Sequence, residues 1–398
     1  MPLQSGQNIA VYYKKQSGKG TPASGAGGTS LPFNDGSAGM SLTKQYSTNN
    51  QTRKDGQRLI QRHASRQTGG SYIENLGVGT QNDWLEAILR STFTASSSVS
   101  ETEMTSITTT TGTIVAAGGS WLTDANIVKG DLVKLTNHST AANNGKWLRV
   151  VDVSATTITV PANSLTLDAA ADTSFTLTVA KTLVSGDTPT ESYWTIEQYF
   201  QDLDKSHTYT DTKVTKLELS IQPNGNILVT WTLMGLDRTS NDTGAAPVFT
   251  AVTDTAVSAL VMTTGSIRIG GVDYDVLTGF TLTIDLGGSV PAVLSSTSPD
   301  VFLDNATVSG SFTVLMQDLV FDDAFDNETP VDFFIVCSEN ETDPADFISF
   351  YVGNATLTAP QGPIGNTGAR TLTVPWAAGK DTAGDGHAPT MVKISTSI

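Results

Sequence analysis

Alternation of apolar and polar residues with a period of two constrains the fold of this chain more than any other sequence feature. This pattern is typical of antiparallel strands that bury one face. The clearest example is residues 215–233, where two alternating runs flank Pro223-Asn224-Gly225. We predict a β-hairpin there, because an Asn-Gly pair tolerates the positive φ of a tight turn. The apolar members of this hairpin are Leu217, Leu219, Ile221, Ile227, Val229, Trp231 and Leu233.

Only two helices are predicted beside the strands. Thr80 and Asp83 have the spacing of a helix capping box, and Trp84 opens an apolar face that runs to Leu89. A weaker pattern predicts a second helix over residues 318–325. The other clear strands are predicted at residues 9–13, 267–269, 272–276, 280–284, 308–314, 331–336, 347–352 and 372–374.

An internal repeat divides the chain into two similar halves. Leu42 precedes Ser71 of a Gly-Ser-Tyr strand by 29 residues, and Leu282 precedes Ser311 of a Gly-Ser-Phe strand by the same 29 residues. Each of these strands leads into one of the predicted helices, and the later strands follow in the same order. We therefore favour a tandem duplication over a chance match between two β-rich segments.

The repeat and one interrupting segment predict the fold class and the domains. The fold class is mainly β: two tandem β-sandwich or barrel-forming domains, each with a flanking short helix, plus one inserted small β domain. The first repeat domain is discontinuous, with residues 1–94 and 187–244, and the second covers residues 245–398. Residues 95–186 hold short strands between Gly-Asp and Asn-Gly turns and predict an inserted β-barrel or sandwich. We expect this insert to decorate the outside of its host domain.

Charge is distributed unevenly along the chain. The net charge is −16, but residues 1–70 hold nine Lys and Arg against two acids, so this segment carries +7 and the remainder −23. Such a basic arm favours contact with the acidic face of another copy, although an unrelated solvated loop and face fit the charges equally well. The candidate arm residues are Arg53, Lys54, Arg58, Arg62 and Arg66. The candidate acidic residues are Asp318, Asp322, Asp323, Asp326 and Glu328.

Catalytic and metal-binding chemistry finds no support in the sequence. The one cysteine, Cys337, lies in an apolar strand and is expected to be buried. The acidic stretch lacks the spacing and the closing Glu of a calcium loop. The four histidines are far apart and show no metal-ligand spacing: His63, His138, His207 and His387. The sequence therefore nominates no catalytic, cofactor-binding or metal-binding residue, and we predict a protein that is not an enzyme and needs no cofactor.

Membrane and nucleic-acid binding are also disfavoured. No run of 18 apolar residues is present, and residues 1–7 lack the features of a secretory signal, so we expect no membrane contact and assembly in a cytoplasm. Arg58, Arg62 and Arg66 have helical spacing that would suit phosphate contacts, but the charge of −23 on the rest of the chain repels phosphates.

Taken together, these patterns resemble the major tail tube proteins of long-tailed bacteriophages, in particular the larger ones with a duplicated tube domain. Four features carry the resemblance: the opening strand at residues 9–13, the long basic excursion at residues 41–68, the Gly-Ser-Tyr strand before the Trp84 helix, and the hairpin at residues 213–235. The resemblance implies that inner sheets join across subunits into a closed barrel, and that such rings stack into a tube through which DNA passes during ejection. Two tube domains per chain imply homotrimeric, pseudo-sixfold rings, with true hexamers as the second choice.

The same resemblance implies the partners and the location. The partners are other copies of the chain, the tape-measure protein, the tail terminator and the distal tail proteins, while genomic DNA transits without specific binding. The location is the virion tail, assembled in the host cytoplasm. The acidic residues 318–328 are then either the partner of the basic arm or a lumen face that repels DNA. Two alternatives remain: a distal-tail or baseplate ring that does not polymerise, and a β-rich carbohydrate-binding surface protein.

Overall fold

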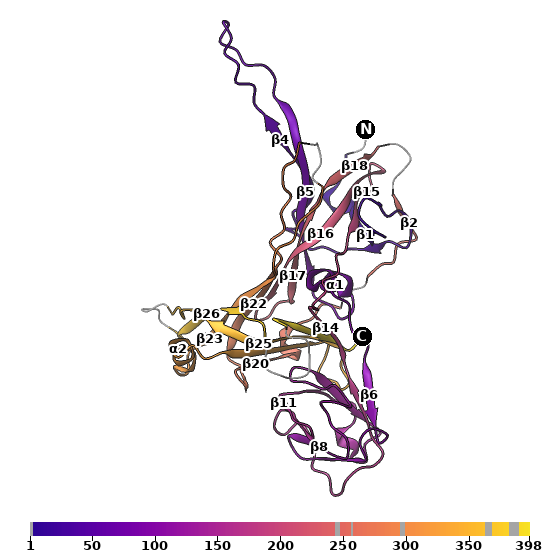
Figure 1. The fold of residues 1–398 in the computed structure, drawn as a ribbon, viewed down its shortest axis with the longest axis vertical. Helices are drawn as coiled ribbons and strands as arrows, with labels where there is room; N and C mark the ends of the chain where they lie inside the picture. Colours follow the sequence, from indigo (N-terminus) through magenta and orange to yellow (C-terminus); the bar gives the residue numbers. More distant parts are fainter. Residues whose placement is uncertain (1–2, 243–246, 256–257, 295–298, 363–367, 382–389) are drawn as a thin grey trace.

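The computed structural model describes residues 3–242, 247–255, 258–294, 299–362, 368–381 and 390–398. The molecule is elongated, with a long hairpin projecting from one end and a separate small unit at the other (Figure 1). The fold is mainly β, as predicted, and it includes two α-helices. No helix in the described ranges is long and apolar enough to cross a bilayer.

The first half of the chain contains these elements of the large sheet and its surroundings: β1 (Ile9–Lys15), β2 (Gly25–Ala26), β3 (Thr29–Ser30), β4 (Gly39–Ser47), β5 (Arg62–Asn75), α1 (Asn82–Leu89), β14 (Lys181–Val184), β15 (Trp194–Phe200), β16 (Lys205–Ile221), β17 (Leu228–Gly235) and β18 (Asp237–Asn241). β14 lies within the range predicted for the insert, 95–186, but it pairs with β27 of the large sheet. The second half contains β19 (Phe249–Thr250), β20 (Ser266–Ile269), β21 (Val272–Asp273), β22 (Leu277–Asp285), β23 (Thr307–Leu315), α2 (Val320–Asp326), β24 (Val331–Ser338), β25 (Phe347–Leu357), β26 (Thr371–Ala378) and β27 (Lys393–Thr396).

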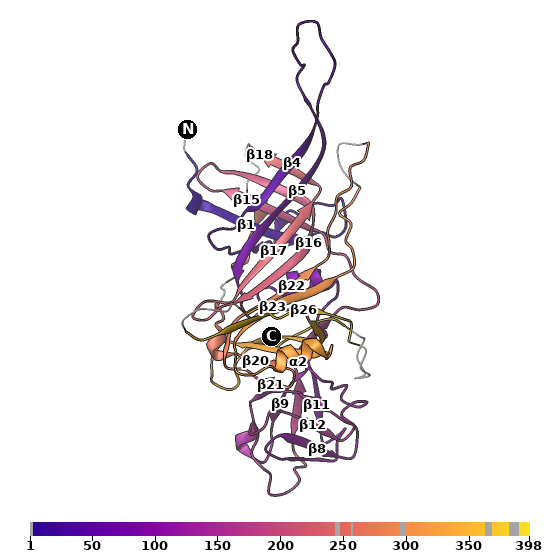
Figure 2. The ribbon, with the colours of Figure 1, turned by 90° about the vertical axis from the view of Figure 1, so that its left-hand side faces the viewer.

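The two halves share one order of strand pairing. In the first half the antiparallel order is β4-β5-β17-β16-β15-β1, and in the second half it is β22-β23-β26-β25-β24-β20. Each set has one further strand at the equivalent place, β18 beside β16 and β27 beside β25. β16 also pairs with β22, so the two sets form one continuous sheet (Figure 2).

Two glycines fix how the halves correspond. Gly70 pairs with Met40 and Gly310 pairs with Leu282. A Cβ at Gly70 would lie 1.9 Å from the Gly39 carbonyl oxygen, and one at Gly310 would lie 2.0 Å from the Thr281 carbonyl oxygen. Both positions therefore exclude any side chain for the same reason, the close approach of the neighbouring strand.

This pairing corrects the predicted match between Leu42 and Leu282. Leu42 pairs with Thr68, so the residue equivalent to Leu282 is Met40. The segment between the paired residues Met40 and Gly70 is two residues longer than the segment between Leu282 and Gly310. Equal spacing in the sequence therefore selected the wrong residue.

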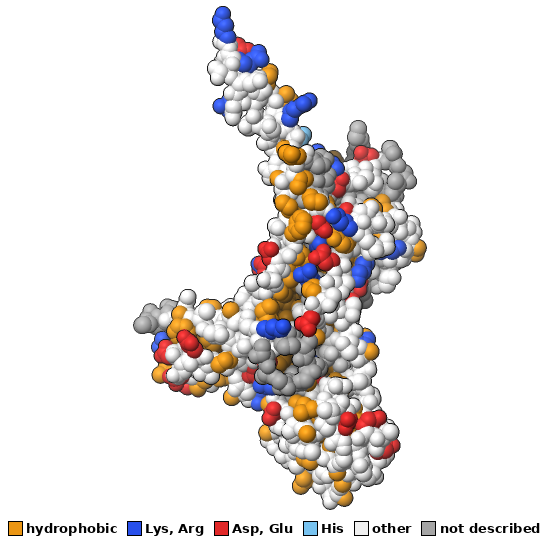
Figure 3. Space-filling model, in the orientation of Figure 1, with side chains coloured by type: hydrophobic (Ala, Val, Ile, Leu, Met, Phe, Trp, Pro, Cys, Tyr) orange, Lys and Arg blue, Asp and Glu red, His pale blue; other side chains and the backbone are white. Residues whose placement is uncertain are grey.

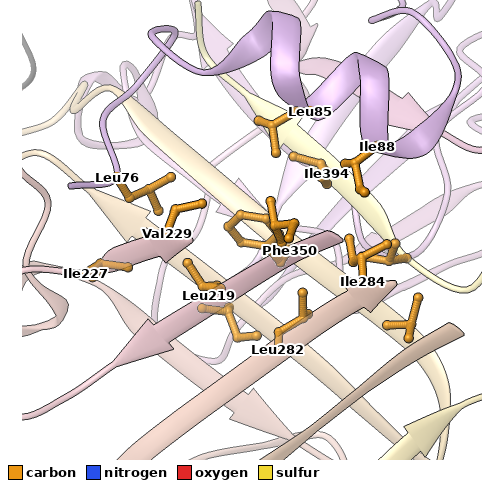
Figure 4. Packing of buried hydrophobic residues seen from close by; sticks show 14 of the residues in the cluster. Leu76, Leu85, Ile88, Leu219, Ile227, Val229, Leu282, Ile284, Phe350 and Ile394 are labelled. Carbon is orange, nitrogen blue, oxygen red and sulfur yellow. The ribbon is translucent and has the colours of Figure 1, made fainter. Parts of the chain in front are cut away.

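The predicted hairpin over residues 215–233 is confirmed as β16 and β17. Leu217 pairs with Trp231 and Leu219 pairs with Val229, and all four side chains are buried. Asn224 in the turn has a φ of 58°. These residues belong to one hydrophobic cluster that spans both halves, as Figure 4 shows for Leu219, Leu282 and Phe350.

The predicted first helix is confirmed, but its capping box is wrong. α1 begins after Gln81, and no side chain caps its N-terminus. Thr80 instead donates its hydroxyl hydrogen to the Gln81 side chain at 2.6 Å. Gln81 is buried and bonds to Glu74 and to the Asn75 carbonyl, so this interior polar group takes the place of a local cap.

The insert forms two four-stranded sheets around its own buried cluster. Its strands are β6 (Ser97–Ser100), β7 (Ser106–Thr109), β8 (Thr113–Ala117), β9 (Leu132–Thr136), β10 (Trp147–Arg149), β11 (Asp152–Val153), β12 (Thr157–Thr159) and β13 (Thr176–Val179). It rests on the second half of the chain, although it is inserted in the first. Trp147 packs on Phe347 of β25 at a centroid distance of 5.1 Å, and the buried Asp131 pairs with Lys393 of β27.

Candidate functional site

The basic arm predicted from the sequence is the β4–β5 hairpin. Its strands extend beyond β17, because β5 begins at Arg62 but pairs with β17 only from Thr68 onward. Residues 48–61 continue the projection without regular strands. Figure 3 shows basic side chains along this projection. Arg53, Lys54, Arg58 and Arg62 are all exposed, and Arg53 pairs with Asp55 within the tip at 3.1 Å.

Arg66, the fifth predicted arm residue, lies in a different environment. Its guanidinium pairs with Asp237 of β18 at 2.6 Å, and both side chains are only one-third exposed. Arg66 therefore ties the base of the hairpin to the body, while the other four cations lie on the free part.

The hairpin also carries apolar residues that the charge pattern did not reveal. Leu59 is 46% exposed and Ile60 is 89% exposed, side by side near the tip. Tyr46 is also exposed and its ring lies 5.0 Å from that of His63. An exposed apolar pair at the end of a projection is a feature of contact surfaces.

The predicted acidic residues gather on and around α2. Phe321 is buried against Phe312 of β23 and Tyr274, at centroid distances of 4.8 and 5.4 Å, and it anchors the helix to the sheet. Among the described residues, no cation forms an ion pair with the five acids, which are Asp318, Asp322, Asp323, Asp326 and Glu328. Within one chain the acids and the hairpin tip lie far apart (Figure 1).

The opposite face of the continuous sheet is rich in hydroxyl groups. Phe312 points to the core, and α2 lies on that side, so the acids do not share a surface with the other face. There, Thr281 lies 3.0 Å from Ser311, and Thr313 lies 3.0 Å from Thr373. Along residues 39–43 of β4, 68–75 of β5 and 216–221 of β16, and along β17, β22, β23 and β26, the charged side chains on this hydroxyl face are Lys216, Glu218 and Asp285.

A cleft of about 880 Å³ opens at the end of the sheet opposite the hairpin tip. The turn between β16 and β17 forms one wall, residues 261–267 form the second, and β21 and the start of β22 form the third. Apolar side chains on these walls include Met262, Tyr274 and Leu277, and the acids Asp273 and Asp275 also line it. Sequence reasoning missed this cleft because its walls are distant in the chain.

The residues weighed for catalysis and metal binding behave mostly as structural groups. Cys337 is fully buried and its burial raises the pKa of the thiol to about 12, so the thiolate is absent at neutral pH. The buried His138 lies 3.3 Å from Asp168 and 3.6 Å from Asp172. No cluster of three potential metal ligands is found in the described ranges, which do not include His387.

The comparison with protein families decides the class of this chain. A family model described as phage tail tube protein matches residues 6–378, which span both halves and the insert. The chain belongs to the phage tail tube family. It is thus a structural component of a phage tail, and the family predicted from the sequence is confirmed. A search of curated proteins found no match to this tail tube protein.

Proposed function

We propose that three copies of this tail tube protein close into a ring, that the rings stack into a tube, and that DNA passes through the channel. In this proposal residues 1–94 with 187–244 and residues 245–398 are two copies of one tube domain, and residues 95–186 are the inserted domain. Three chains then supply six domains around the ring.

The junction between the two halves carries the proposal. β16 of the first half pairs with β22 of the second, with Leu217 opposite Ile284 and Leu219 opposite Leu282. Figure 4 shows Leu219 beside Leu282 and Ile284 on the core side. Two similar units are therefore already joined edge to edge within one chain, and repeating the same junction between chains extends the sheet.

Two matching edges are available for that junction. At one end of the continuous sheet β4 pairs only with β5, among the described residues. At the other end residues 358–362 continue from β25 along β26, where Gln361 and Thr373 exchange two backbone hydrogen bonds of 2.8 Å. In the repeat, β4 of the first half is equivalent to β22 of the second half. Residues 358–362 of the second half are equivalent to the second part of β16 in the first half.

A shared irregularity supports the second equivalence. The Thr215 hydroxyl donates to the Thr232 carbonyl at 3.1 Å, and the Thr358 hydroxyl donates to the Pro375 carbonyl at 3.1 Å. Counting from these threonines, Pro360 stands where Leu217 stands in the first half. Gln361 turns its backbone groups toward β26, so those of Pro360 face the free edge, and proline has no N–H to donate there. The junction between chains therefore has one backbone hydrogen bond fewer than the junction between β16 and β22.

The hydroxyl face is the proposed lumen wall. A closed sheet has one face toward the channel, and the core and both helices occupy the other face of this sheet. Of its three charges, Lys216 and Glu218 pair with each other at 2.6 Å, so the wall is nearly neutral. Few cations face the phosphates of passing DNA, which favours sliding over binding.

The inserted domain then lies on the outside of the tube. It contacts β25 through Trp147 and Phe347 and β27 through Asp131 and Lys393. Ion pairs join Lys129 to Asp332 of β24 at 2.9 Å and Arg149 to Asp273 of β21 at 2.8 Å. The proposed partners are the neighbouring rings, which stack on one another, and three other kinds of tail protein. The tape-measure protein lies in the lumen, and the terminator and distal tail proteins lie at the ends of the tube.

Cysteine cross-linking tests the ring junction. Ser41 and Gln361 take the places of Thr283 and Glu218, which lie opposite each other in β22 and β16. Directly opposite residues bring Cβ atoms about 4.5–5.5 Å apart, close to the span of a disulfide. The double variant Ser41→Cys with Gln361→Cys should give oxidised dimers and closed trimers on a non-reducing gel. Cys337 does not interfere because it is buried.

The matched controls are the two single variants and the pair Thr43→Cys with Gln361→Cys, which is shifted by two residues on the same face. A ladder that ends at six chains would replace the trimer by a hexamer. Equal cross-linking in the shifted pair, or none in either pair, would refute the junction.

The two alternatives differ in what they form. A distal-tail or baseplate ring would close but would not stack, and electron microscopy of the purified protein distinguishes isolated rings from tubes. Carbohydrate binding is disfavoured because five of the six tryptophans are buried, and the sixth, Trp147, packs on Phe347 in the contact between the insert and the second half.

A further inference from the structure

We propose that α2 docks on the surface formed by β16 and β18 of the next chain in the ring. The inference rests on the proposed ring, because it assigns a second contact at the junction between β4 and residues 358–362. It commits the acids of α2 to a neighbouring copy of the chain, and not to the channel or to the hairpin tip.

The outer side of α2 is exposed in the described part of the chain. Leu319, Asp323 and Asp326 are spaced i, i+4 and i+7, so they lie on one side of the helix, opposite the buried Phe321. Leu319 is 56% exposed, and Val320 beside it is 49% exposed. A side that is both apolar and acidic fits a partner surface that offers apolar and basic residues.

α1 shows how a helix is covered at the junction within one chain. It contacts β16 and β14, and β14 pairs with β27. Figure 4 shows Leu85 and Ile88 of α1 beside Ile394 of β27. A Cβ at Gly79, just before α1, would lie 3.5 Å from Cγ2 of Ile398. The helix of the first half is thus covered by the second half, which is the unit that joins the β16 edge.

α2 has the equivalent place in the second half. It contacts β25, which is the counterpart of β16 in the repeat. In the proposed ring, the edge at residues 358–362, which follows β25, receives β4 of the next chain. The unit that covers α2 is therefore the first half of that chain.

Strand register identifies the equivalent positions. Tyr209 of β16 and Val352 of β25 hold the same place beside the bulge of their strand pairs. Counting back by two residues on each strand, His207 takes the place of Phe350.

The strands beside these residues extend the equivalence to the surface near the helices. Ser240 of β18 lies opposite His207, and Ile394 of β27 lies opposite Phe350. The surface that α1 contacts at Ile394 within one chain thus corresponds to the surface at Ser240 that α2 would contact in the next chain.

This receiving surface is aromatic and basic. The ring of Phe200 lies 5.1 Å from that of His207, edge to face. Burial and the charge of Arg238 lower the pKa of His207, which places the guanidinium near the imidazole. Arg238 forms no ion pair with another described residue, and the exposed Lys205 lies 3.7 Å from the exposed Asp242. Two cations are therefore available to a partner that brings carboxylates.

Each helix carries side chains that match its own surface. α1 presents Leu85 and Ile88 to an aliphatic surface, whereas α2 presents Asp323 and Asp326 where the equivalent surface is basic. The difference in charge between the two helices thus follows from the difference between a junction within the chain and a junction between chains.

The first experiment is a site-specific photo-cross-link from α2. Benzoyl-phenylalanine in place of Leu319, in an assembled mixture of isotopically heavy and light copies, should cross-link one copy to another. Mass spectrometry should locate the product within residues 200–210 or 236–242. Cross-links confined to residues 48–61, to the same copy or to any other surface would overturn the docking site.

This test and the test of the ring junction fail separately, because photo-cross-linking needs only two copies in contact. Trimers linked through Ser41→Cys and Gln361→Cys, without a Leu319 product on the receiving surface, would keep the ring and remove this contact. A Leu319 product on the receiving surface without those trimers would keep the contact and remove the strand junction.

The second experiment reverses charge. Asp323→Lys with Asp326→Lys should raise the protein concentration needed for the disulfide-linked trimer by about tenfold or more, because attraction at each junction becomes repulsion. Adding Lys205→Glu should recover part of the loss. Glu339→Lys with Glu341→Lys is the matched control, since these acids are also exposed on the second half and the change in charge is the same. Normal assembly of the α2 variant, an equal loss in the control, or no recovery with Lys205→Glu would contradict the docking.

Discussion

The two halves of this chain share one order of strand pairing and differ in what their first hairpins do. Between β4 and β5 the chain projects into solvent (Figure 1), whereas the connection between β22 and β23 is held to the body at residues 300–304. Val301 of the second excursion is fully buried, and its carbonyl accepts a hydrogen bond of 2.7 Å from Lys213. The repeated sheet is thus a common framework. A few contacts decide whether the connection between its first two strands projects as an arm, as between β4 and β5, or is tied to the body as a strap, the name for the connection between β22 and β23.

The two helices differ in how much of their surface they bury. α1 buries five side chains, including Trp84, which stacks on Trp194 at 5.3 Å. α2 buries only Phe321 and leaves Leu319, Val320 and Phe325 at least one-third exposed. α1 is thus anchored by a whole apolar face, whereas α2 is anchored by one aromatic side chain.

The largest expected effect comes from a variant that loosens the strap between β22 and β23. The Lys213 side chain is 3% exposed and pairs with Glu191 and, at 3.3 Å, with Asp300. Lys213→Met leaves these carboxylates without their main partner and should lower the free energy of unfolding by about 3–5 kcal/mol, as measured by urea denaturation. Lys19→Met is the control, because the exposed Lys19 pairs with the same Asp300 at 3.6 Å and should cost less than about 1 kcal/mol. Equal effects of the two variants would show that the strap is not held by the buried lysine.

An intermediate effect sharpens the correspondence between the halves. Gly70→Ala and Gly310→Ala each place a methyl group against a backbone carbonyl, and each should cost about 1–3 kcal/mol or more in thermal unfolding. Gly225→Ala is the control, since a Cβ there meets nothing within 4 Å. If one of the two substitutions were neutral, the two glycines would not hold equivalent places.

The effect that is smallest per step of the titration depends on pH. Glu74 of β5 takes the place of Val314 in β23, and burial raises the pKa of its carboxyl group to about 8, although Gln81 donates a hydrogen bond to it. The unfolded chain ionises this group near pH 4.5 and the folded chain does not, so stability falls between pH 4.5 and about pH 8. Glu74→Gln should remove a decline of at most about 1.4 kcal/mol per pH unit. Parallel stability profiles of both proteins from pH 4 to 9 would contradict this origin.

Local patterns predicted the strands of the repeat well. The alternation at residues 215–233 specified the hairpin and its buried face, because one face of that strand pair lies in the core. The match of Gly70 with Gly310 was also visible, since both glycines are required by the same close approach. The error at Leu42 arose because spacing in sequence counts loop residues, and loop length is not set by the sheet.

Contacts between distant segments were beyond sequence reasoning. Nothing in residues 95–186 indicates that the insert packs on β25 and β27 of the other half, because those contacts depend on where the sheet brings the chain. Likewise, a period-two pattern defines two faces of a sheet without showing which one packs on the core. The sequence alone therefore could not place the acids near α2 on either face. Leu59 and Ile60 are adjacent in the sequence, but the basic residues around them drew attention to charge, and their exposure was not predicted.

Ring closure by three chains is tested by the symmetry of assembled tubes, determined by cryo-electron microscopy of the purified protein. We expect three chains per ring, with β4 of each chain beside residues 358–362 of the next and the hydroxyl face toward the channel. Rings of six chains, or a β4 edge that faces solvent in the assembled tube, would contradict it.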